Sequence, residues 1–330
     1  MKLIVQIPCY NEENTLPLVL ASIPRTIPGV DEIETLVIDD GSMDRTVQVA
    51  RDLGVNHIIR HVGNKGLATA FQTGLDACLR LSADIIVNTD GDNQYPQEDI
   101  PRLIQPIING EADVVVGNRQ TDKIPHFSRQ KKLLQWLGSW IVRALSGTGV
   151  PDAPSGFRAY SREAALRLKV HSKYTYTLET LIQAGMQRTA VSYVPISVNE
   201  QLRESRLITG IWSYVKQSAA TIVRTYAMYE PLKVFMYIGI LISLVGIIGV
   251  ARFVYFVFAG SGSGHVQSLV ISAVFLIVGF QIMLIGLLAD LIAANRRLLE
   301  DILYRIKRIE TGMVKEGERG NVREPSARNQ

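Results

Sequence analysis

The chain has 330 residues, enough for one large or two ordinary domains, and 47% of them are hydrophobic, which is high for a protein that is soluble throughout. Its net charge of +4 is modest, and the basic residues gather beside two apolar runs, which favours an anionic lipid surface over nucleic acid as the partner. The two cysteines, Cys9 and Cys78, lie far apart without metal-ligand spacing, which argues for packing roles and against a zinc site or disulfide framework.

The first half of the chain alternates between strand-like runs and helical patterns. The strand-like runs are rich in β-branched residues and lie at residues 3–7, 35–38, 57–60, 84–88 and 113–116. Helical patterns such as those at 44–53 and 67–81 separate them. This alternation predicts an α/β fold with a doubly wound, mainly parallel sheet in residues 1–207. Because the chain enters its first strand directly, we expect no signal peptide and a cytosolic first domain.

Polar clusters follow three of the predicted strands. They are Pro8-Cys9-Tyr10-Asn11-Glu12, Asp39-Asp40-Gly41-Ser42 and Asp90-Gly91-Asp92. Ligands of doubly wound sheets bind outside the carboxyl ends of the strands, so we expect these three clusters to converge on one crevice.

The second half of the chain becomes progressively more apolar. A helical pattern with Trp136 and Trp140 at residues 130–146 leads into a loop rich in glycine and proline, and a further strand and helix precede another strand at 191–198. Residues 208–231 place apolar residues at helical spacing among aromatic and basic ones. This pattern predicts a juxtamembrane amphipathic helix.

Two nearly uncharged runs follow, each long enough to cross a bilayer. We place two transmembrane helices at about 234–259 and 267–289, within residues 232–294. The loop between them has no Lys or Arg, whereas basic residues precede the first run and follow the second. The positive-inside rule therefore predicts an inner-membrane protein with both termini in the cytoplasm. Residues 295–330 are predicted to form a cytoplasmic helix and, after about Thr311, a disordered tail.

The acidic cluster Asp90-Gly91-Asp92 closes an apolar strand. Two carboxylates one residue apart can bind a hard cation such as Mg²⁺ or Mn²⁺, whose remaining positions take phosphate oxygens and water. Such a metal neutralises the charge on a departing nucleoside diphosphate. A plain turn explains the same three residues, because Asp and Gly are favoured in turns. The neighbouring motifs decide between these readings.

Five motifs lie in the order and setting of a known family. They are Pro8-x-Tyr10-Asn11-Glu12, Val37-Ile38-Asp39-Asp40-Gly41-Ser42-x-Asp44-x-Thr46, Gly63-Asn64-Lys65-Gly66, Asp90-Gly91-Asp92-x-Gln94-x-Pro96 and Ser155-Gly156-Phe157-Arg158. Together they resemble glycosyltransferase family 2, with its GT-A fold, although Gly91 stands where alanine is commoner. With the carboxyl-terminal hairpin, the chain resembles the polyprenyl-phosphate glycosyltransferases related to dolichol-phosphate mannose synthase. The motifs cover about residues 3–198, and the anchor is similar in architecture only.

The resemblance implies roles for individual residues. The implied donor-binding residues are Pro8, Tyr10, Glu12, Asp39, Asp40, Lys65, Asp90 and Arg119, and the implied metal ligands are Asp90, Asp92 and Gln94. Strand alternation indicates that only one of Asp39 and Asp40 faces the ligand, and the sequence does not choose between them. The segment from Asp39 to Ser42 also fits a helix-capping turn, and Lys65 a solvated loop charge.

The catalytic candidates are Asp92 and Asp152, and the resemblance implies that Asp152 lies nearest the reacting sugar carbon. A structural ion pair between Asp152 and Arg158 is the alternative. Arg129, Arg158 and Arg206 are candidates for binding the acceptor or its phosphate, because arginine suits bidentate contact with phosphate. Arg203 stands where the mannose synthases carry a glycine, which leaves the role of Arg206 open.

The implied reaction is inverting transfer of one hexose from a nucleoside-diphosphate sugar to a polyprenyl phosphate. UDP-glucose and undecaprenyl phosphate are the favoured substrates, and GDP-mannose is the second choice of donor. A lipid monophosphate is already mostly anionic at neutral pH, so Asp152 is expected to orient it rather than deprotonate it. The alternatives are a lipid hydroxyl acceptor, a processive synthase, for which two spans offer little pore, and a noncatalytic scaffold that recruits partners through residues 296–310. Homo-oligomerisation is left open.

Overall fold

The structure is a computed structural model that describes residues 1–121, 129–172, 175–199, 211–260 and 266–321. The chain divides into two compact units. The first comprises Met1–Val223 with Leu303–Gln330 and contains the sheet, and the second, Arg224–Ile302, is helical. The chain therefore leaves the sheet unit, forms the second unit and returns.

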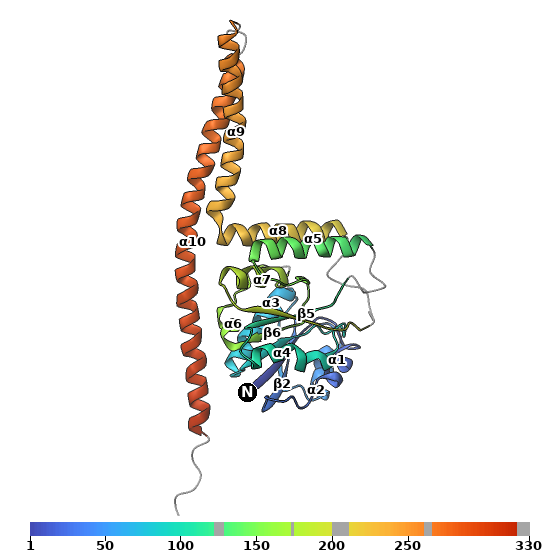
Figure 1. Cartoon of the computed structure of the whole chain (residues 1–330). Coiled ribbons are helices and arrows are strands. Elements are labelled where there is room, and N and C mark those ends of the chain that lie inside the picture. Colours follow the sequence, from blue (N-terminus) through green and yellow to red (C-terminus); the bar gives the residue numbers. More distant parts are fainter. Residues whose placement is uncertain (122–128, 173–174, 200–210, 261–265, 322–330) are drawn as a thin grey trace, which may run out of the picture. The chain divides into compact units, whose positions relative to one another are not determined.

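Seven strands form one sheet in the first unit (Figure 1). They are β1 (Lys2–Cys9), β2 (Glu32–Asp39), β3 (His57–Arg60), β4 (Ile85–Asn88), β5 (Val114–Asn118), β6 (Arg158–Ser161) and β7 (Val191–Pro195). The order is β3-β2-β1-β4-β6-β5-β7, with β6 antiparallel to β4 and β5 and all other neighbours parallel. The predicted α/β, mainly parallel sheet is confirmed. The antiparallel direction of β6 was not predicted.

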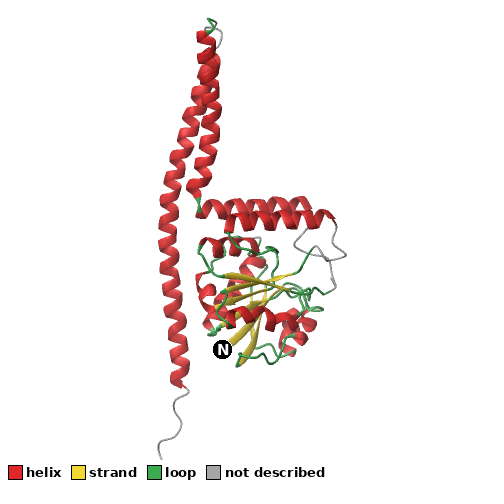
Figure 2. Cartoon of the chain, in the orientation of Figure 1, coloured by secondary structure: helices red, strands yellow, loops and turns green. Residues whose placement is uncertain are grey.

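Helices cover both faces of this sheet (Figure 2). They are α1 (Leu16–Ser22), α2 (Thr46–Asp52), α3 (Leu67–Arg80), the short 3₁₀ helix η1 (Gln97–Asp99), α4 (Ile100–Ile108), α6 (Arg162–Arg167) and α7 (Thr177–Met186). Two further helices, α5 (Arg129–Ser146) and α8 (Ile211–Tyr229), pack against α7 (Figure 1). This arrangement leaves the strand ends, with their connecting loops, to form the candidate site.

Alternate residues of β1 point to opposite faces, and each face has its own core. Leu3, Val5 and Ile7 pack with α1 and α4, whereas Ile4 packs with α3 and α6. All are fully buried, and truncating one such contact, as in Leu75→Ala on α3, would cost about 2–5 kcal/mol of stability. Both faces of β1 are therefore covered by helices.

The two cysteines belong to these cores. Cys9 lies in the core on one face of the sheet and Cys78 in the core on the other, and both are unpaired. Burial raises the pKa of both thiols, so they stay protonated. The predicted packing roles are confirmed.

Within the part of the chain that the structure describes, two helices are long and apolar enough to cross a membrane: α9 (Pro231–Phe258) and α10 (Val266–Asn321). The most apolar 18-residue stretches of α9 and α10 have mean hydropathies of 2.5 and 2.6, yet only 11% and 17% of these stretches are buried within the molecule. A core helix of a soluble protein would be mostly buried. The exposed apolar surface therefore agrees with the two predicted spans.

Small residues line the contact between α9 and α10, which form a hairpin (Figure 2). A Cβ on Gly239 would lie 2.8 Å from the carbonyl oxygen of Gly279, and a Cβ on Gly246 would lie 2.8 Å from that of Ser272. Glycine at these positions lets the two backbones approach closely, which is how helices commonly associate in membranes.

Helix α10 extends further than the sequence predicted. The second predicted span and the cytoplasmic helix predicted from residue 295 are one continuous helix, which runs on past Thr311, where the disordered tail was expected, to Asn321. The reason is that residues 290–311 contain neither Gly nor Pro and are rich in helix-forming Leu, Ala, Arg and Glu. Residues 322–330 lie outside the described part of the chain.

Candidate active site

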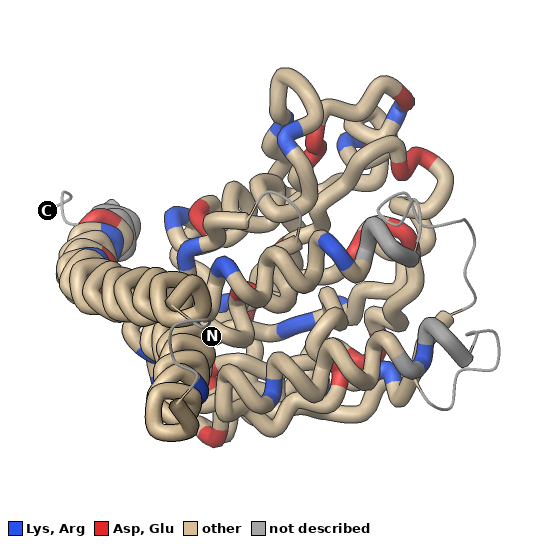
Figure 3. Tube along the Cα trace, turned by 90° about the horizontal axis from the view of Figure 1, so that it is seen from above, with Lys and Arg blue, Asp and Glu red and all other residues tan. Residues whose placement is uncertain are grey.

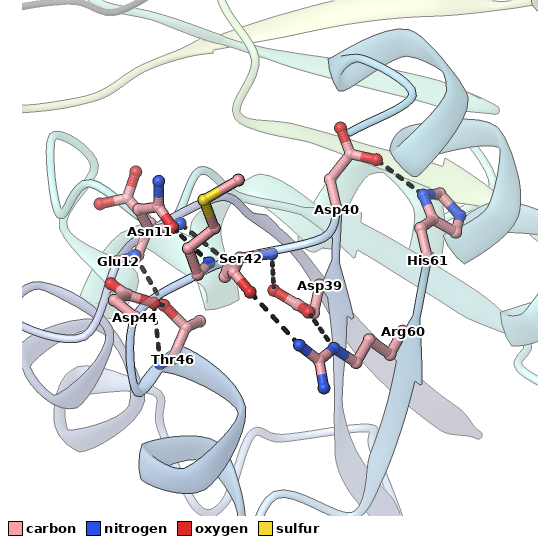
Figure 4. Close-up of polar contacts among 10 residues, drawn as sticks. Asn11, Glu12, Asp39, Asp40, Ser42, Asp44, Thr46, Arg60 and His61 are labelled. Atoms are coloured by element: carbon pink, nitrogen blue, oxygen red, sulfur yellow. Dashed lines mark hydrogen bonds and ion pairs between the residues drawn. The ribbon is translucent and has the colours of Figure 1, made fainter. Parts of the chain in front are cut away.

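The turns that follow β1 and β2 are tied to each other. The backbone N–H of Asn11 donates to Ser42 Oγ at 2.8 Å, and the N–H of Met43 donates to Asn11 Oδ1 at 2.8 Å (Figure 4). Asn11 has a φ of 57°, a left-handed conformation that Asn tolerates better than most residues. The first two predicted clusters therefore meet at one edge of the sheet.

Of the two adjacent aspartates, Asp40 anchors a loop. It accepts hydrogen bonds from the N–H groups of Lys65 and Gly66 at 2.9 and 2.8 Å. Its Oδ1 also lies 2.7 Å from His61 Nδ1 (Figure 4). These contacts occupy the buried carboxylate, so Asp40 fits the predicted donor contact poorly. The side chain of Lys65 is exposed and remains a predicted phosphate contact. Sequence reasoning missed His61 because its partner is 21 residues away.

Asp39 is buried but borders an exposed cation. Its Oδ1 accepts a hydrogen bond from the N–H of Ser42 at 3.1 Å, as in the predicted turn. Its Oδ2 lies 3.2 Å from Arg60 Nε, an ion pair without hydrogen-bond geometry, and the Arg60 side chain is 61% exposed. Asp39 is therefore a better candidate than Asp40 for binding the predicted donor substrate. Arg60 is a neighbour of Asp39 that the motif did not reveal.

The acidic turn Asp90-Gly91-Asp92 packs against the end of β1. A Cβ on Gly91 would lie 3.0 Å from Cys9 Sγ and 3.2 Å from Glu12 Cγ, so a side chain at this position would be crowded. The glycine in place of the commoner alanine thus lets the two loops approach. Asp92 Oδ1 also accepts a hydrogen bond from the N–H of Gln94 at 3.2 Å. The residues form a turn and also present carboxylates at the sheet edge.

The residues of this turn fit a hard divalent cation. Asp90 and Asp92 offer carboxylate oxygens, the ligands that Mg²⁺ and Mn²⁺ prefer. Among the described residues, no three His, Cys, Asp or Glu side chains are grouped to hold an ion. A cation here would complete its coordination with phosphate oxygens and water. Gln94 makes backbone contacts with Asp92 and Asn199, and its side chain stays a predicted ligand.

Asp152 pairs with Arg119. Arg119 Nε donates to Asp152 Oδ2 at 2.8 Å and Arg119 Nη2 to Oδ1 at 2.9 Å, and the Arg119 backbone N–H donates to Oδ2 at 3.1 Å. The side chains are 10% and 3% exposed. The predicted alternative, an ion pair between Asp152 and Arg158, is therefore wrong in its partner. The observed pair ties the loop after β5 to the loop before β6.

Arg158 lies in the interior. Its guanidinium donates to the carbonyl oxygens of Ser155 at 2.8 Å and Ala153 at 2.6 Å, and to Thr180 Oγ1 at 2.8 Å. The side chain is fully buried. The predicted contact between Arg158 and an acceptor phosphate is therefore contradicted by its enclosure. Arg158 instead shapes the 152–156 loop from behind.

The other predicted site residues are placed as follows. Pro8 is buried in β1, and Tyr10 is half-buried just after it. Glu12 is buried, and its Oε2 accepts a threonine hydroxyl at 2.7 Å. Arg206 lies outside the described residues, as does the side chain of Arg129, the first residue of α5.

Three buried side chains beside the acidic turn were not predicted. Asn88, Tyr95 and Tyr176 each form a hydrogen bond with the backbone of Gly156. The sequence offered one signal only, the position of Tyr95 between two predicted motif residues, Gln94 and Pro96.

The comparisons with known proteins agree with this geometry. The sequence model described as glycosyl transferase family 2 matches residues 4–168, which is half of the chain. The chain belongs to glycosyltransferase family 2. A second model, described as the GtrB C-terminal hairpin, matches residues 230–294 of this family 2 enzyme, which include α9 and the first part of α10.

Relatives of this family 2 chain include polyprenyl-phosphate sugar transferases. It is 29% identical to an undecaprenyl-phosphate mannosyltransferase of Micrococcus luteus, over 64% of this chain and 89% of that protein. It is 34% identical to a UDP-N-acetylglucosamine–dolichyl-phosphate N-acetylglucosaminyltransferase of Methanococcus voltae, over 58% and 82%. A glucosyl-3-phosphoglycerate synthase of Mycobacterium tuberculosis, solved with Mn²⁺, UDP-glucose and phosphoglyceric acid, is similar in structure, with a TM-score of 0.56, 26% identity and coverage of 68% and 80%. The predicted GT-A fold is confirmed.

Proposed function

We propose that this enzyme transfers one hexose, with inversion, from a nucleoside-diphosphate sugar to a polyprenyl phosphate at the cytoplasmic face of the inner membrane. One observation carries the proposal: the acidic turn Asp90–Asp92 packs against the end of β1 in a chain that also forms an apolar hairpin. The turn suits the diphosphate of a donor. The hairpin suits an acceptor that does not leave the bilayer.

On the donor side, Asp39 and the neighbouring Arg60 would meet the nucleoside. Asp90 and Asp92 would hold Mg²⁺ or Mn²⁺, which, when bound, neutralises the charge on the departing diphosphate. UDP-glucose is the favoured donor, supported by the structurally similar synthase that was solved with UDP-glucose and Mn²⁺. GDP-mannose is the alternative, and the Micrococcus luteus relative, an undecaprenyl-phosphate mannosyltransferase, supports mannose as the sugar.

On the acceptor side, an oxygen of the lipid phosphate attacks the anomeric carbon of the sugar. The new carbon–oxygen bond forms as the bond to the diphosphate breaks, and the nucleoside diphosphate leaves with the electron pair. A lipid monophosphate, with a second pKa of about 6, needs no base at neutral pH. Both oxygens of Asp152 are engaged by Arg119, which suits this carboxylate to orienting groups rather than accepting a proton.

The acceptor would be met at a surface formed by α5 and α8. As far as Val223, these helices lie side by side (Figure 3), and basic residues occur at Lys132 and Arg143 on α5 and at Lys216 on α8. We call Trp136, Leu137, Trp140 and Val223 the α5–α8 face; all four are exposed. Tryptophan beside basic residues favours the membrane–water interface. A catalytic unit resting on the bilayer there would raise the effective concentration of a lipid acceptor.

The test uses the full chain in lipid nanodiscs. Radiolabelled UDP-glucose or GDP-mannose is offered with polyprenyl phosphate or with polyprenol, with and without a chelator. We expect transfer to the phosphate alone and only with Mg²⁺ or Mn²⁺ present. Transfer to polyprenol alone would favour the lipid-hydroxyl alternative, and binding without any turnover would favour a scaffold.

The metal role is tested separately with Asp92→Ala. This change removes one carboxylate of the acidic turn, so we expect loss of metal-dependent transfer with membrane insertion unchanged. Insertion is checked by alkaline extraction of membranes, which leaves spanning proteins in the pellet. Full transfer activity in Asp92→Ala would sink the metal assignment.

A further inference from the structure

We propose that Gly156 is a positioning residue that sets where the Asp90 carboxylate lies, and that Asn88, Tyr95 and Tyr176 hold its peptide group in place. The inference rests on the proposed function, in which Asp90 binds the metal. It explains in physical terms why the motif Ser155-Gly156-Phe157-Arg158 has glycine at its second position.

The first observation is the space around Gly156. A Cβ built on this residue would lie 2.9 Å from Asp90 Oδ2, 3.2 Å from Asp90 Oδ1 and 2.9 Å from the hydroxyl of Tyr176. The Asp90 carboxylate therefore rests directly against the glycine. The φ of Gly156 is not in the left-handed region, so the position needs glycine for space and not for backbone conformation.

The second observation is that the backbone of Gly156 is held from both sides. Its N–H donates to the hydroxyl of Tyr95 at 3.0 Å. Its carbonyl oxygen accepts hydrogen bonds from Asn88 Nδ2 at 2.9 Å and from the Tyr176 hydroxyl at 3.3 Å. Asn88 is itself oriented, because its Oδ1 accepts a hydrogen bond from Gln6 Nε2 at 2.9 Å.

The side chains that hold Gly156 are rigid and buried. The ring of Tyr95 stacks on Phe157 with centroids 5.3 Å apart, and the ring of Tyr176 stacks on Phe71 with centroids 3.9 Å apart. Packed aromatic rings with few rotamers fix the glycine more firmly than long polar side chains would.

The same loop carries Asp152. The N–H of Ser155 donates to the Asp152 carbonyl oxygen at 3.3 Å, and Arg158 holds the carbonyls of Ser155 and Ala153 from behind. Gly156 and Asp152 thus belong to one braced loop. A shift at Gly156 would move the metal-binding carboxylate and disturb the residue expected nearest the sugar carbon.

The test replaces Gly156 with alanine and measures Mn²⁺ binding by electron paramagnetic resonance in the purified full chain, with uridine diphosphate present. Gly149→Ala is the matched control, because a Cβ on Gly149 meets no atom within 4 Å. Substitution of a group that positions a metal ligand typically weakens metal binding by about 10- to 100-fold. We therefore expect Mn²⁺ binding to weaken by at least about tenfold in Gly156→Ala and to stay unchanged in Gly149→Ala.

A second variant, Tyr95→Phe, keeps the stacked ring and removes the hydroxyl that accepts the Gly156 N–H. We expect weaker Mn²⁺ binding here too, by a smaller factor, with cooperative thermal unfolding retained. If Gly156→Ala does not fold, the Mn²⁺ binding of Tyr95→Phe is the test of the inference. Mn²⁺ binding at the level of the unsubstituted chain in both variants, or in Tyr95→Phe alone if Gly156→Ala does not fold, would overturn the inference and leave the proposed function standing. Absence of Mn²⁺ binding by the unsubstituted chain would overturn the metal role itself, and the inference with it.

Discussion

Asp152 and Arg119 form a buried ion pair in which two side-chain hydrogen bonds join the guanidinium to the carboxylate. Removing one member would leave the other charged and buried, which typically costs about 3–5 kcal/mol. The pair therefore stabilises the loops after β5 and before β6 as well as placing a charge near the expected reaction centre. A structural role and a catalytic role have to be separated by a variant that keeps the shape of the pair.

Asp152→Asn is such a variant. An amide keeps one acceptor oxygen for Arg119 and cannot act as a base. If Asp152 orients the substrates, kcat/KM should fall by less than about hundredfold, since a true general base contributes about 10²–10⁴-fold. Below pH 6 the rates of both proteins should fall together as the lipid phosphate gains a proton, with a flat profile above about pH 7. Complete loss of transfer in Asp152→Asn would instead favour a lipid-hydroxyl acceptor.

Single residues also show where the sequence was informative. The motif residues Asp39 and Asp90 follow strands, so their place at the sheet edge could be predicted from periodicity. Arg158 looked like a phosphate ligand because the sequence shows its charge but not the carbonyls of Ser155 and Ala153 that surround it. Asp40 likewise could not be separated from Asp39 without the distant His61.

Among the helices, α5 and α8 bear on the membrane proposal. Their inner sides pack through Val142 and Ile222 against α7, so the tryptophans Trp136 and Trp140, with exposed fractions of 58% and 51%, face outward. Exposed tryptophans on a helix are costly in water and favourable at a bilayer interface. The two exposed tryptophans therefore support the proposed contact of the α5–α8 face with lipid.

The contact can be measured with tryptophan fluorescence, because the chain has only three tryptophans. A variant that keeps Trp140 and carries Trp136→Phe and Trp212→Phe is reconstituted in nanodiscs with brominated lipids. Lipid contact should quench its emission strongly, because bromine quenches only at short range. If the emission of Trp140 is quenched no more than that of a control tryptophan at position 53, the α5–α8 face does not contact the membrane.

The matched control introduces a tryptophan at Leu53, which is 51% exposed beside α2 at the opposite end of the sheet unit (Figure 1). Leu53→Trp in a background without the three native tryptophans should show little quenching. The comparison removes effects of the nanodisc on any exposed tryptophan.

Strand patterns were informative as well, with one limit. The strands β1 to β5 could be predicted because their apolar, β-branched runs are bounded by turn residues. β6 has only four residues, Arg158–Ser161, and its direction is set by pairing with β4 and β5 on either side. Sequence periodicity holds no information about such long-range pairing.

At the scale of the whole molecule, the chain returns to its sheet unit after the hairpin. The Tyr304 hydroxyl donates a hydrogen bond to Glu163 on α6 at 2.9 Å. The guanidinium of Arg167 lies 4.3 Å from the centre of the Tyr304 ring. One turn on, Lys307 donates to Asp76 on α3 at 2.7 Å. The end of α10 thus belongs to the sheet unit.

Tyr304→Ala should weaken this attachment. It removes a hydrogen bond to a carboxylate and a cation–π contact, together worth about 2 kcal/mol. We expect a Tm lower by a few degrees and faster proteolysis within residues 303–321, measured on the full chain in detergent. Ile309→Ala, on an exposed side of the same helix, is the control and should change neither. Equal effects of the two substitutions would contradict the attachment.

The sequence could not reveal this return. The charged stretch at residues 296–310 was predicted to form a cytoplasmic helix, and recruitment of partners by a noncatalytic scaffold was the alternative. Its positions Tyr304 and Lys307 find their partners more than 140 residues earlier, at Glu163 and Asp76. Only the folded chain brings these groups together.

The central claim is that one sugar, without its phosphate, moves to a lipid phosphate. It is tested most directly by incubating the full chain in nanodiscs with polyprenyl phosphate and a nucleoside-diphosphate sugar, then measuring the released nucleotide and the mass of the lipid together. The account predicts equal amounts of nucleoside diphosphate and of polyprenyl phosphate carrying a single hexose. Release of nucleoside monophosphate with transfer of a sugar phosphate, or a lipid carrying several sugars, would contradict it.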